Sequence, residues 1–176
     1  MNFRKILTIT LLSFSFAVYQ VGDQISQGDQ DRVFEVCYGA EHHGIEPVGG
    51  RYNLTLGDYN GFTNDTGIFY VLMIDMAASW WGPCWNNIGT MVGIEGYYED
   101  NPNVKIITNL DDIGQPYSCQ QWGDRHQFYN PDIYPLMTDD GNQDVLWSWL
   151  NTGGAFPSTA YIDHTMTVFF KGNNAQ

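Results

Sequence analysis

Positive charge is scarce in this chain. Only 7 of the 176 residues are Lys or Arg, against 20 Asp or Glu, so the formal net charge is -13. A protein that binds nucleic acid needs a basic face that neutralises phosphates and releases their counterions. The charge balance therefore excludes a nucleic-acid partner, and for the same reason it disfavours binding to anionic membrane surfaces.

Cysteine and long hydrophobic runs are scarce too. With 3 cysteines the chain is not a disulfide-dense miniprotein, and at least one thiol lacks a partner within the chain. No apolar run of about 18 residues follows the N-terminal region, so no membrane-spanning helix is expected there. Hydrophobic residues make up 43% of the chain, which is enough for the core of one ordinary domain.

The first 17 residues have the pattern of a secretory signal peptide. Arg4 and Lys5 precede the apolar stretch 6–17, in which Ser15 and Ala17 occupy the small positions of a cleavage site. A buried first helix or strand is the alternative. We predict a signal peptide at 1–17, an irregular N-terminal extension at 18–49 and one domain at 50–176. The expected localisation is secreted or periplasmic, where disulfides persist and no membrane contact remains after cleavage.

Apolar periodicity and turn residues predict alternating strands and helices. Helices are expected at 84–98, 118–128 and 144–150, and strands at 33–38, 52–56, 68–74, 104–108, 132–137, 158–162 and 166–170. Asn60-Gly61 predicts a hairpin turn after the strand at 52–56. Strand–helix–strand units imply parallel pairing, whereas the last two strands must be antiparallel. The predicted fold is α/β, a mixed central sheet with helices on both faces.

One loop sequence is specific. The segment Ala78-Ser79-Trp80-Trp81-Gly82-Pro83-Cys84 follows the central strand and opens the first long helix. It resembles the active-site loop of the thioredoxin superfamily, in its secreted redoxin and thiol–disulfide reductase (TlpA-like) branch, where the pattern is Trp-Cys-Gly-Pro-Cys. In this sequence Trp81 stands at the position of the first cysteine.

Three other features agree with this resemblance. Asp75, six residues before Trp81, matches the buried acid of the family, and Phe156-Pro157 precedes a strand where the family has a cis-proline. The hairpin predicted at Asn60-Gly61 is similar to the extra N-terminal hairpin of that branch. The resemblance extends over about residues 50–171 and implies a thioredoxin-like fold.

The resemblance also implies roles for individual residues. Position 81 would carry the nucleophile, Cys84 would resolve the mixed disulfide, Asp75 would transfer the proton and Pro157 would align the substrate backbone. The groove that binds substrate would be lined by Trp80, Gly82, Pro83 and Phe156. The implied partner is a disulfide-containing protein or a small thiol or disulfide, and no cofactor or metal is implied.

Trp81 conflicts with that chemistry. A cysteine at a helix N-terminus ionises readily and attacks disulfides, but an indole can do neither. Dithiol exchange is therefore predicted to be lost or impaired. Trp81 could be natural, engineered or the product of a misread cysteine or selenocysteine codon, and a chance match to the motif is a fourth alternative. A different class of function also stays open: a non-catalytic module that binds an extended peptide along the aromatic groove.

The remaining candidates are cysteines, a buried acid and two polar clusters. Cys37 and Cys119 are slightly favoured as a disulfide, with a Cys119–Cys84 approach as the alternative. Asp75, in an apolar strand, should have a raised pKa. His42-His43 and the acidic segment 139–144 lack the ligand spacing of zinc or calcium sites, so solvated turns are expected at both.

Overall fold

The structure is a computed structural model, and it describes residues 19–111, 116–141, 143–152 and 155–173. The predicted signal peptide at 1–17 lies outside these ranges. Among the described residues, no helix is both long and apolar enough to cross a membrane.

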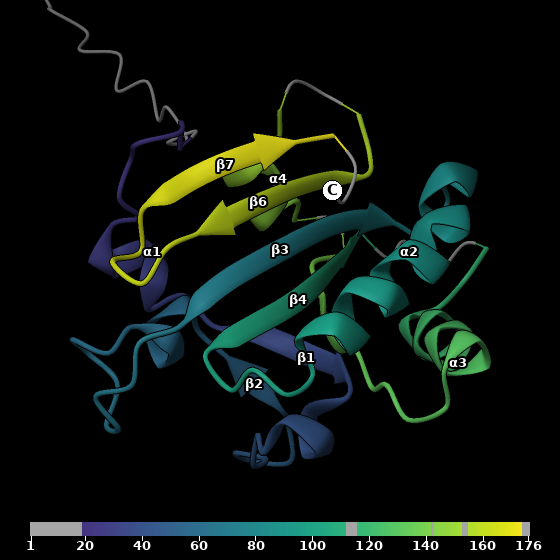
Figure 1. Cartoon of the computed structure of the whole chain (residues 1–176), viewed down its shortest axis with the longest axis horizontal. Coiled ribbons are helices and arrows are strands. Elements are labelled where there is room, and N and C mark those ends of the chain that lie inside the picture. The colour runs from purple at the N-terminus through teal and green to yellow at the C-terminus, as the bar shows by residue number, and fades with distance from the viewer. Residues whose placement is uncertain (1–18, 112–115, 142, 153–154, 174–176) are drawn as a thin grey trace, which may run out of the picture.

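A seven-stranded mixed sheet forms the centre of the molecule (Figure 1). Its strands are β1 (Phe34–Tyr38), β2 (Asn53–Leu54), β3 (Val71–Ala78), β4 (Val104–Asp111), β5 (Leu136–Asp139), β6 (Ser158–Ile162) and β7 (Val168–Gly172). Their spatial order is β2-β1-β5-β4-β3-β6-β7. The β3–β4 and β4–β5 pairs are parallel, and β6 and β7 are antiparallel, as the sequence predicted.

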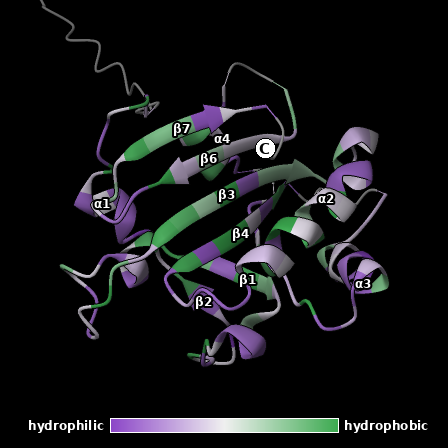
Figure 2. Ribbon diagram, viewed as in Figure 1, coloured by the Kyte–Doolittle hydropathy of each residue, from purple (hydrophilic) through white to green (hydrophobic). Residues whose placement is uncertain are grey.

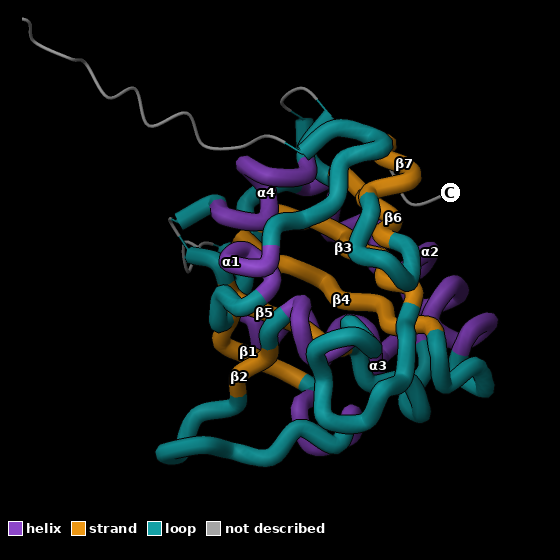
Figure 3. Tube along the Cα trace, turned by 90° about the vertical axis from the view of Figure 1, so that its left-hand side faces the viewer, coloured by secondary structure: helices purple, strands orange, loops and turns teal. Residues whose placement is uncertain are grey.

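Helices cover both faces of the sheet (Figure 3). They are α1 (Gln27–Gln30), α2 (Gly82–Tyr98), α3 (Cys119–Tyr129) and α4 (Val145–Leu150), with 3-10 turns η1 (Ala40–His43) and η2 (Leu56–Tyr59). The α4 side chains pack with Leu72, Ile74 and Met76, whereas Ile88 of α2 and Trp122 of α3 pack with Ala77. Because successive strand residues point to opposite faces, α2 and α3 share the face onto which Asp75 projects.

The central strand β3 is hydrophobic over most of its length (Figure 2). Its residues from Leu72 to Ala78 are all buried, since β4 and β6 flank it and helices cover both its faces. The sequence placed this strand at 68–74, so its start was wrong by three residues and its end by four. The strand predicted at 132–137 is also shifted, because β5 begins only at Leu136.

The hairpin turn predicted at Asn60-Gly61 is wrong. Thr55 and Asp58 form a reciprocal capping box at the start of η2, which ends directly before these residues. The Asn60 side chain is buried and donates to Gln30 Oε1 over 2.8 Å, which anchors α1. The turn that follows, in which Thr63 N donates to Asn60 O over 2.9 Å, leads to β3, which does not pair with β2. The antiparallel pair expected near the N-terminus exists, but it is formed by β1 and β2.

The segment expected as an irregular extension contributes to the sheet. The strand predicted at 33–38 is found as β1, and it pairs with both β2 and β5. Tyr19 and Ile25 from the same segment are buried in the core on the α4 face.

Candidate functional site

The loop between β3 and α2 is held tightly by backbone hydrogen bonds. Ser79 N donates to Asp111 O at the end of β4 over 3.1 Å, and Trp81 N donates to Ala78 O over 3.1 Å. Cys84 N donates to Trp81 O over 3.0 Å as the helix begins. Pro83 suits the first turn of α2, where its missing N–H has no partner to lose. The loop therefore has a fixed shape at the carboxyl ends of two parallel strands.

Trp81 is the N-cap residue of α2 and is 44% exposed. Its side chain makes no capping hydrogen bond to the first turn. The site thus presents the positive end of a 17-residue helix to solvent, which would stabilise a thiolate. An indole gains nothing from that field, because it carries no negative charge.

Cys84 lies one turn further along α2 and is only 2% exposed. Burial, with a smaller contribution from the nearby Asp75 carboxylate, raises the pKa of its thiol to about 12. A backbone hydrogen bond at Ala78 partly opposes this rise. Cys84 is therefore a protonated thiol at neutral pH, shielded from solvent.

Asp75 is buried beneath α2, 3% exposed, in the middle of the sheet. Thr159 of β6 and Thr108 of β4 are its register partners on either side, and Thr159 Oγ1 donates to Asp75 Oδ1 over 3.4 Å. Burial raises the pKa of Asp75 to about 7, as the sequence predicted in direction. A carboxyl group with that pKa can take up and release a proton near neutrality.

The Phe156–Pro157 peptide bond is cis, as the resemblance predicted. Ser158 pairs with Met76, so Pro157 lies beside the end of β3 where the loop to α2 begins. The ring of Phe156 contacts that of Trp80 edge to face, with centroids 5.8 Å apart. The fold therefore brings Pro157 next to the loop, although about 75 residues separate them in the sequence.

Aromatic rings surround the exposed end of the loop. Trp80 Nε1 donates to Asp111 Oδ2 over 3.1 Å, and Trp80 lies 6.2 Å from Trp81 between ring centroids. Phe156 also stacks on Trp147, 3.8 Å away. Gly82 and Pro83 are exposed beside these rings. All four residues assigned to the groove thus lie near Trp81.

Cys37 and Cys119 form a disulfide with Cα atoms 6.2 Å apart. This is the pairing that the sequence slightly favoured, and the alternative approach of Cys119 to Cys84 is wrong, since Cys84 is free. The bond joins β1 to the first turn of α3. It cross-links two elements near the site and leaves Cys84 as the site's one thiol.

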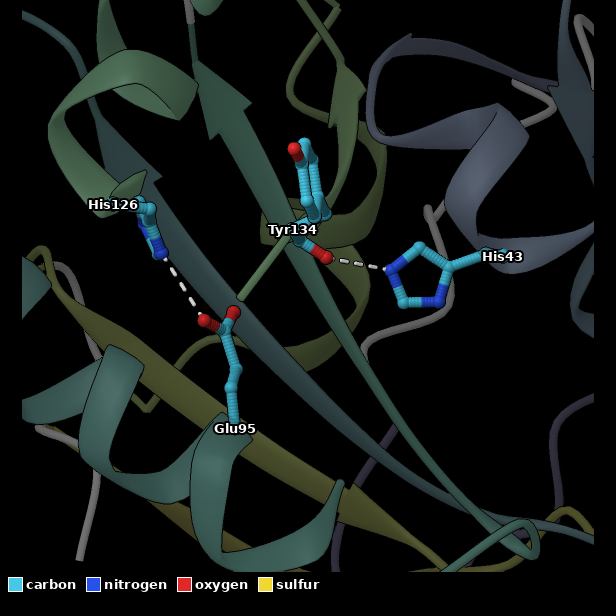
Figure 4. Close-up of polar contacts among 4 residues, drawn as sticks. All are labelled: His43, Glu95, His126 and Tyr134. Carbon is cyan, nitrogen blue, oxygen red and sulfur yellow. Dashed lines mark hydrogen bonds and ion pairs between the residues drawn. The ribbon is translucent and has the colours of Figure 1, made fainter. Parts of the chain in front are cut away.

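Sequence reasoning missed a buried hydrogen-bonded pair between α2 and α3. His126 Nδ1 donates to Glu95 Oε2 over 3.2 Å, and the two side chains are 1% and 9% exposed (Figure 4). One signal was available: Glu95 falls on the stripe formed by Cys84, Ile88 and Val92, where only apolar residues are expected.

The polar cluster His42-His43 makes protein contacts. His43 Nε2 donates to Tyr134 O over 2.7 Å (Figure 4), and the His42 ring stacks on that of Tyr134. Within the described part of the chain, no three His, Cys, Asp or Glu side chains are grouped so that they could hold a metal ion.

Strand order, helix placement and the loop beside a cis-proline define the thioredoxin fold. By sequence alone the chain matches no family model and no curated protein. Solved structures do match over most of the chain, and several are thiol:disulfide oxidoreductases.

Three of these structures illustrate the likeness. A Chlorobium tepidum protein described as thiol:disulfide interchange protein DsbE shares 14% identity at a TM-score of 0.55, over 90% of this chain and 88% of that one. A secreted Mycobacterium tuberculosis disulfide oxidoreductase shares 8% identity at a TM-score of 0.54, over 86% of this chain and 89% of that one. The thioredoxin domain of a Bacteroides vulgatus thiol–disulfide oxidoreductase shares 14% identity at a TM-score of 0.52, over 92% of this chain and 91% of that one. The structural similarity supports the fold, and at 8–14% identity the chemistry has to be argued from the site.

Proposed function

We propose that this protein is a thioredoxin-like thiol–disulfide oxidoreductase family member whose dithiol exchange is lost or impaired by Trp81. One observation carries the proposal. An indole occupies the exposed N-cap of α2, while Cys84, Asp75 and Pro157 are arranged behind and beside it. Every group that dithiol exchange requires is present except the attacking sulfur.

The chemistry follows from restoring that sulfur. A thiolate at position 81 would attack a substrate disulfide, forming a mixed disulfide and expelling one substrate thiolate. Asp75 would take the proton from Cys84, whose sulfur would then attack the mixed disulfide. The S–S bond to the substrate breaks and a bond between positions 81 and 84 forms. Two electrons pass to the substrate, and an external thiol reductant must then reduce the disulfide between positions 81 and 84.

The substrate class follows from the groove. A disulfide-containing protein, or a small thiol or disulfide, would lie across Trp80 and Phe156, with an extended backbone beside Pro157. We also infer a secreted or periplasmic location. The support is the leader-like segment at 1–17, the Cys37–Cys119 disulfide and the secreted protein among the structural neighbours.

The test is a disulfide-reduction assay, with insulin as substrate and reduced glutathione as electron donor. We expect no turnover above background for the unaltered chain and clear turnover for Trp81→Cys. Trp81→Ser is the matched control, because it removes the indole without supplying a second sulfur, and it should stay inactive. Turnover by the unaltered chain would contradict the proposal. Tight capture of an extended peptide, with no gain for Trp81→Cys, would contradict it in favour of a binding module.

A further inference from the structure

A layer of polar side chains lies under α2, between that helix and the sheet. Asp75 and Thr108 are register partners on β3 and β4, and both are nearly inaccessible, at 3% and 1% exposure. Glu95 reaches into the same layer from α2 and His126 reaches in from α3. A polar layer in a core is costly unless its members interact, so their arrangement requires an explanation.

The hydrogen bonding of this layer is incomplete. His126 bonds to Glu95 through Nδ1, but its Nε2 is buried without a hydrogen-bond partner. The hydroxyl of Thr108, beside Asp75, is also buried and unpartnered. Buried polar groups are almost always satisfied, so these two atoms indicate a layer that can hold an internal water or a proton.

Electrostatic coupling links the pair to Asp75. Among charged groups, His126 lowers the pKa of Asp75 and Glu95 raises it. Cys84 faces the same carboxylate from α2, and the Asp75 charge raises the thiol pKa in return. The other register partner, Thr159 of β6, contributes a hydrogen bond without charge.

The pair also has a route to solvent. Glu95 lines a cavity of about 380 Å³ near the C-terminal end of α2, together with His42, His43, Lys105 and Tyr134. Both Lys105 and Glu95 act electrostatically on His43 in that cavity, with opposite signs. Glu95 thus stands between the buried layer and a water-accessible pocket far from the Trp81 end of the helix.

We propose that His126 and Glu95 are positioning residues that set the protonation of Asp75 and connect it to solvent through the pocket at the C-terminal end of α2. This inference rests on the proposed function, since Asp75 matters to exchange only if Cys84 resolves. In the exchange step the S–H bond of Cys84 breaks and an O–H bond forms on Asp75. The proton taken up by Asp75 then leaves to solvent through the polar layer and the pocket that Glu95 lines.

The direct test follows the Asp75 carboxyl carbon by NMR as a function of pH in the unaltered chain, so it needs no turnover. His126→Asn preserves a donor near the Nδ1 position but cannot become charged, and it should raise the Asp75 pKa by about one unit, a tenfold change. Glu95→Gln removes the opposing charge and should shift that pKa downward. If the substitutions only loosened the packing, the Asp75 pKa would shift in the same direction in both variants, and that result would overturn the proposal.

His164→Asn is the matched control, because it makes the same chemical change in the exposed turn before β7. It should leave the Asp75 titration unchanged, and an equal shift in this variant would contradict a specific role for His126. In the Trp81→Cys background, His126→Asn should also move the pH profile of turnover upward by about one unit. Turnover with an unmoved profile would refute this inference alone. Absent turnover with opposite NMR shifts would refute the proposed function and leave the coupling of the pair to Asp75 supported.

Discussion

Helices α2 and α3 both begin at the carboxyl end of a parallel strand, and both carry a cysteine in the first turn, yet their starts are built differently. At α3, Ser118 and Gln121 form a reciprocal capping box, and Cys119 is bonded to Cys37. At α2, Trp81 gives no side-chain cap, and Cys84 is free. One start has its donors and its sulfur satisfied. The other has no side-chain cap, and its sulfur is a buried free thiol.

The difference separates a helix start that stabilises the fold from a helix start that belongs to the candidate site. A capped and cross-linked terminus gains stability and loses reactivity. An open helix terminus beside a cis-proline and above a buried acid is less stable, but it is the place where a thiolate would be stabilised. The two starts therefore differ at the N-cap residue, which is Trp81 at α2 and Ser118 at α3.

The largest effect should come from breaking the cross-link at α3. Replacing Cys37 and Cys119 by Ser removes a bond between residues 82 positions apart, and the loop-entropy argument gives a loss of roughly 4–5 kcal/mol in the free energy of unfolding. Urea unfolding measures this. Cys84→Ser is the control at the α2 end, where no cross-link is lost, and it should cost far less. Similar losses for both would contradict the division between scaffold and site.

The next effect comes from the acid under α2. The pKa of Asp75 is raised to about 7, so between pH 4 and pH 7 the folded chain holds a proton that the unfolded chain has released. Stability must therefore fall as the pH rises through this window. Asp75→Asn should remove the loss and be more stable than the unaltered chain by roughly 4 kcal/mol at pH 8, with little difference at pH 4.

The measurement for Asp75 is urea unfolding at a series of pH values. Asp132→Asn makes the same chemical change at an exposed position and is the control. It should keep the pH dependence of the unaltered chain. A parallel pH dependence in Asp75→Asn and the unaltered chain would show that Asp75 is ionised in the fold at no cost.

The smallest effects concern the caps themselves. Ser118→Ala should lower the free energy of unfolding by about 1 kcal/mol, because it removes the side-chain acceptor at the N-terminus of α3. Trp81→Asp supplies such an acceptor at α2 and should raise stability by about 0.5–1 kcal/mol. Thermal unfolding of both variants measures the contrast. If Trp81→Asp is less stable than the unaltered chain, the indole contributes packing that outweighs a cap.

Local patterns predicted much of the fold. The apolar spacing of Ile88, Met91 and Ile94 gave α2, and the capping signal at Ser118 lies at the start of the predicted second helix. The patterns failed where tertiary contacts decide, as at Asn60-Gly61, where the chain turns but the strands before and after the turn pair with other strands. The His126–Glu95 pair was missed because its two residues meet only when α2 packs against α3.

The sequence by itself determined the chemistry that the loop can and cannot do, because the ability of a side chain to ionise or attack is a property of its own atoms. It fixed an indole at position 81, one cysteine a turn later and an acid six residues before. The tertiary structure decided which of three cysteine pairings forms, how deeply Cys84 and Asp75 are buried, and that Pro157 lies beside the loop. These depend on contacts between residues far apart in the chain, whose strand register and burial arise only when the whole sheet assembles.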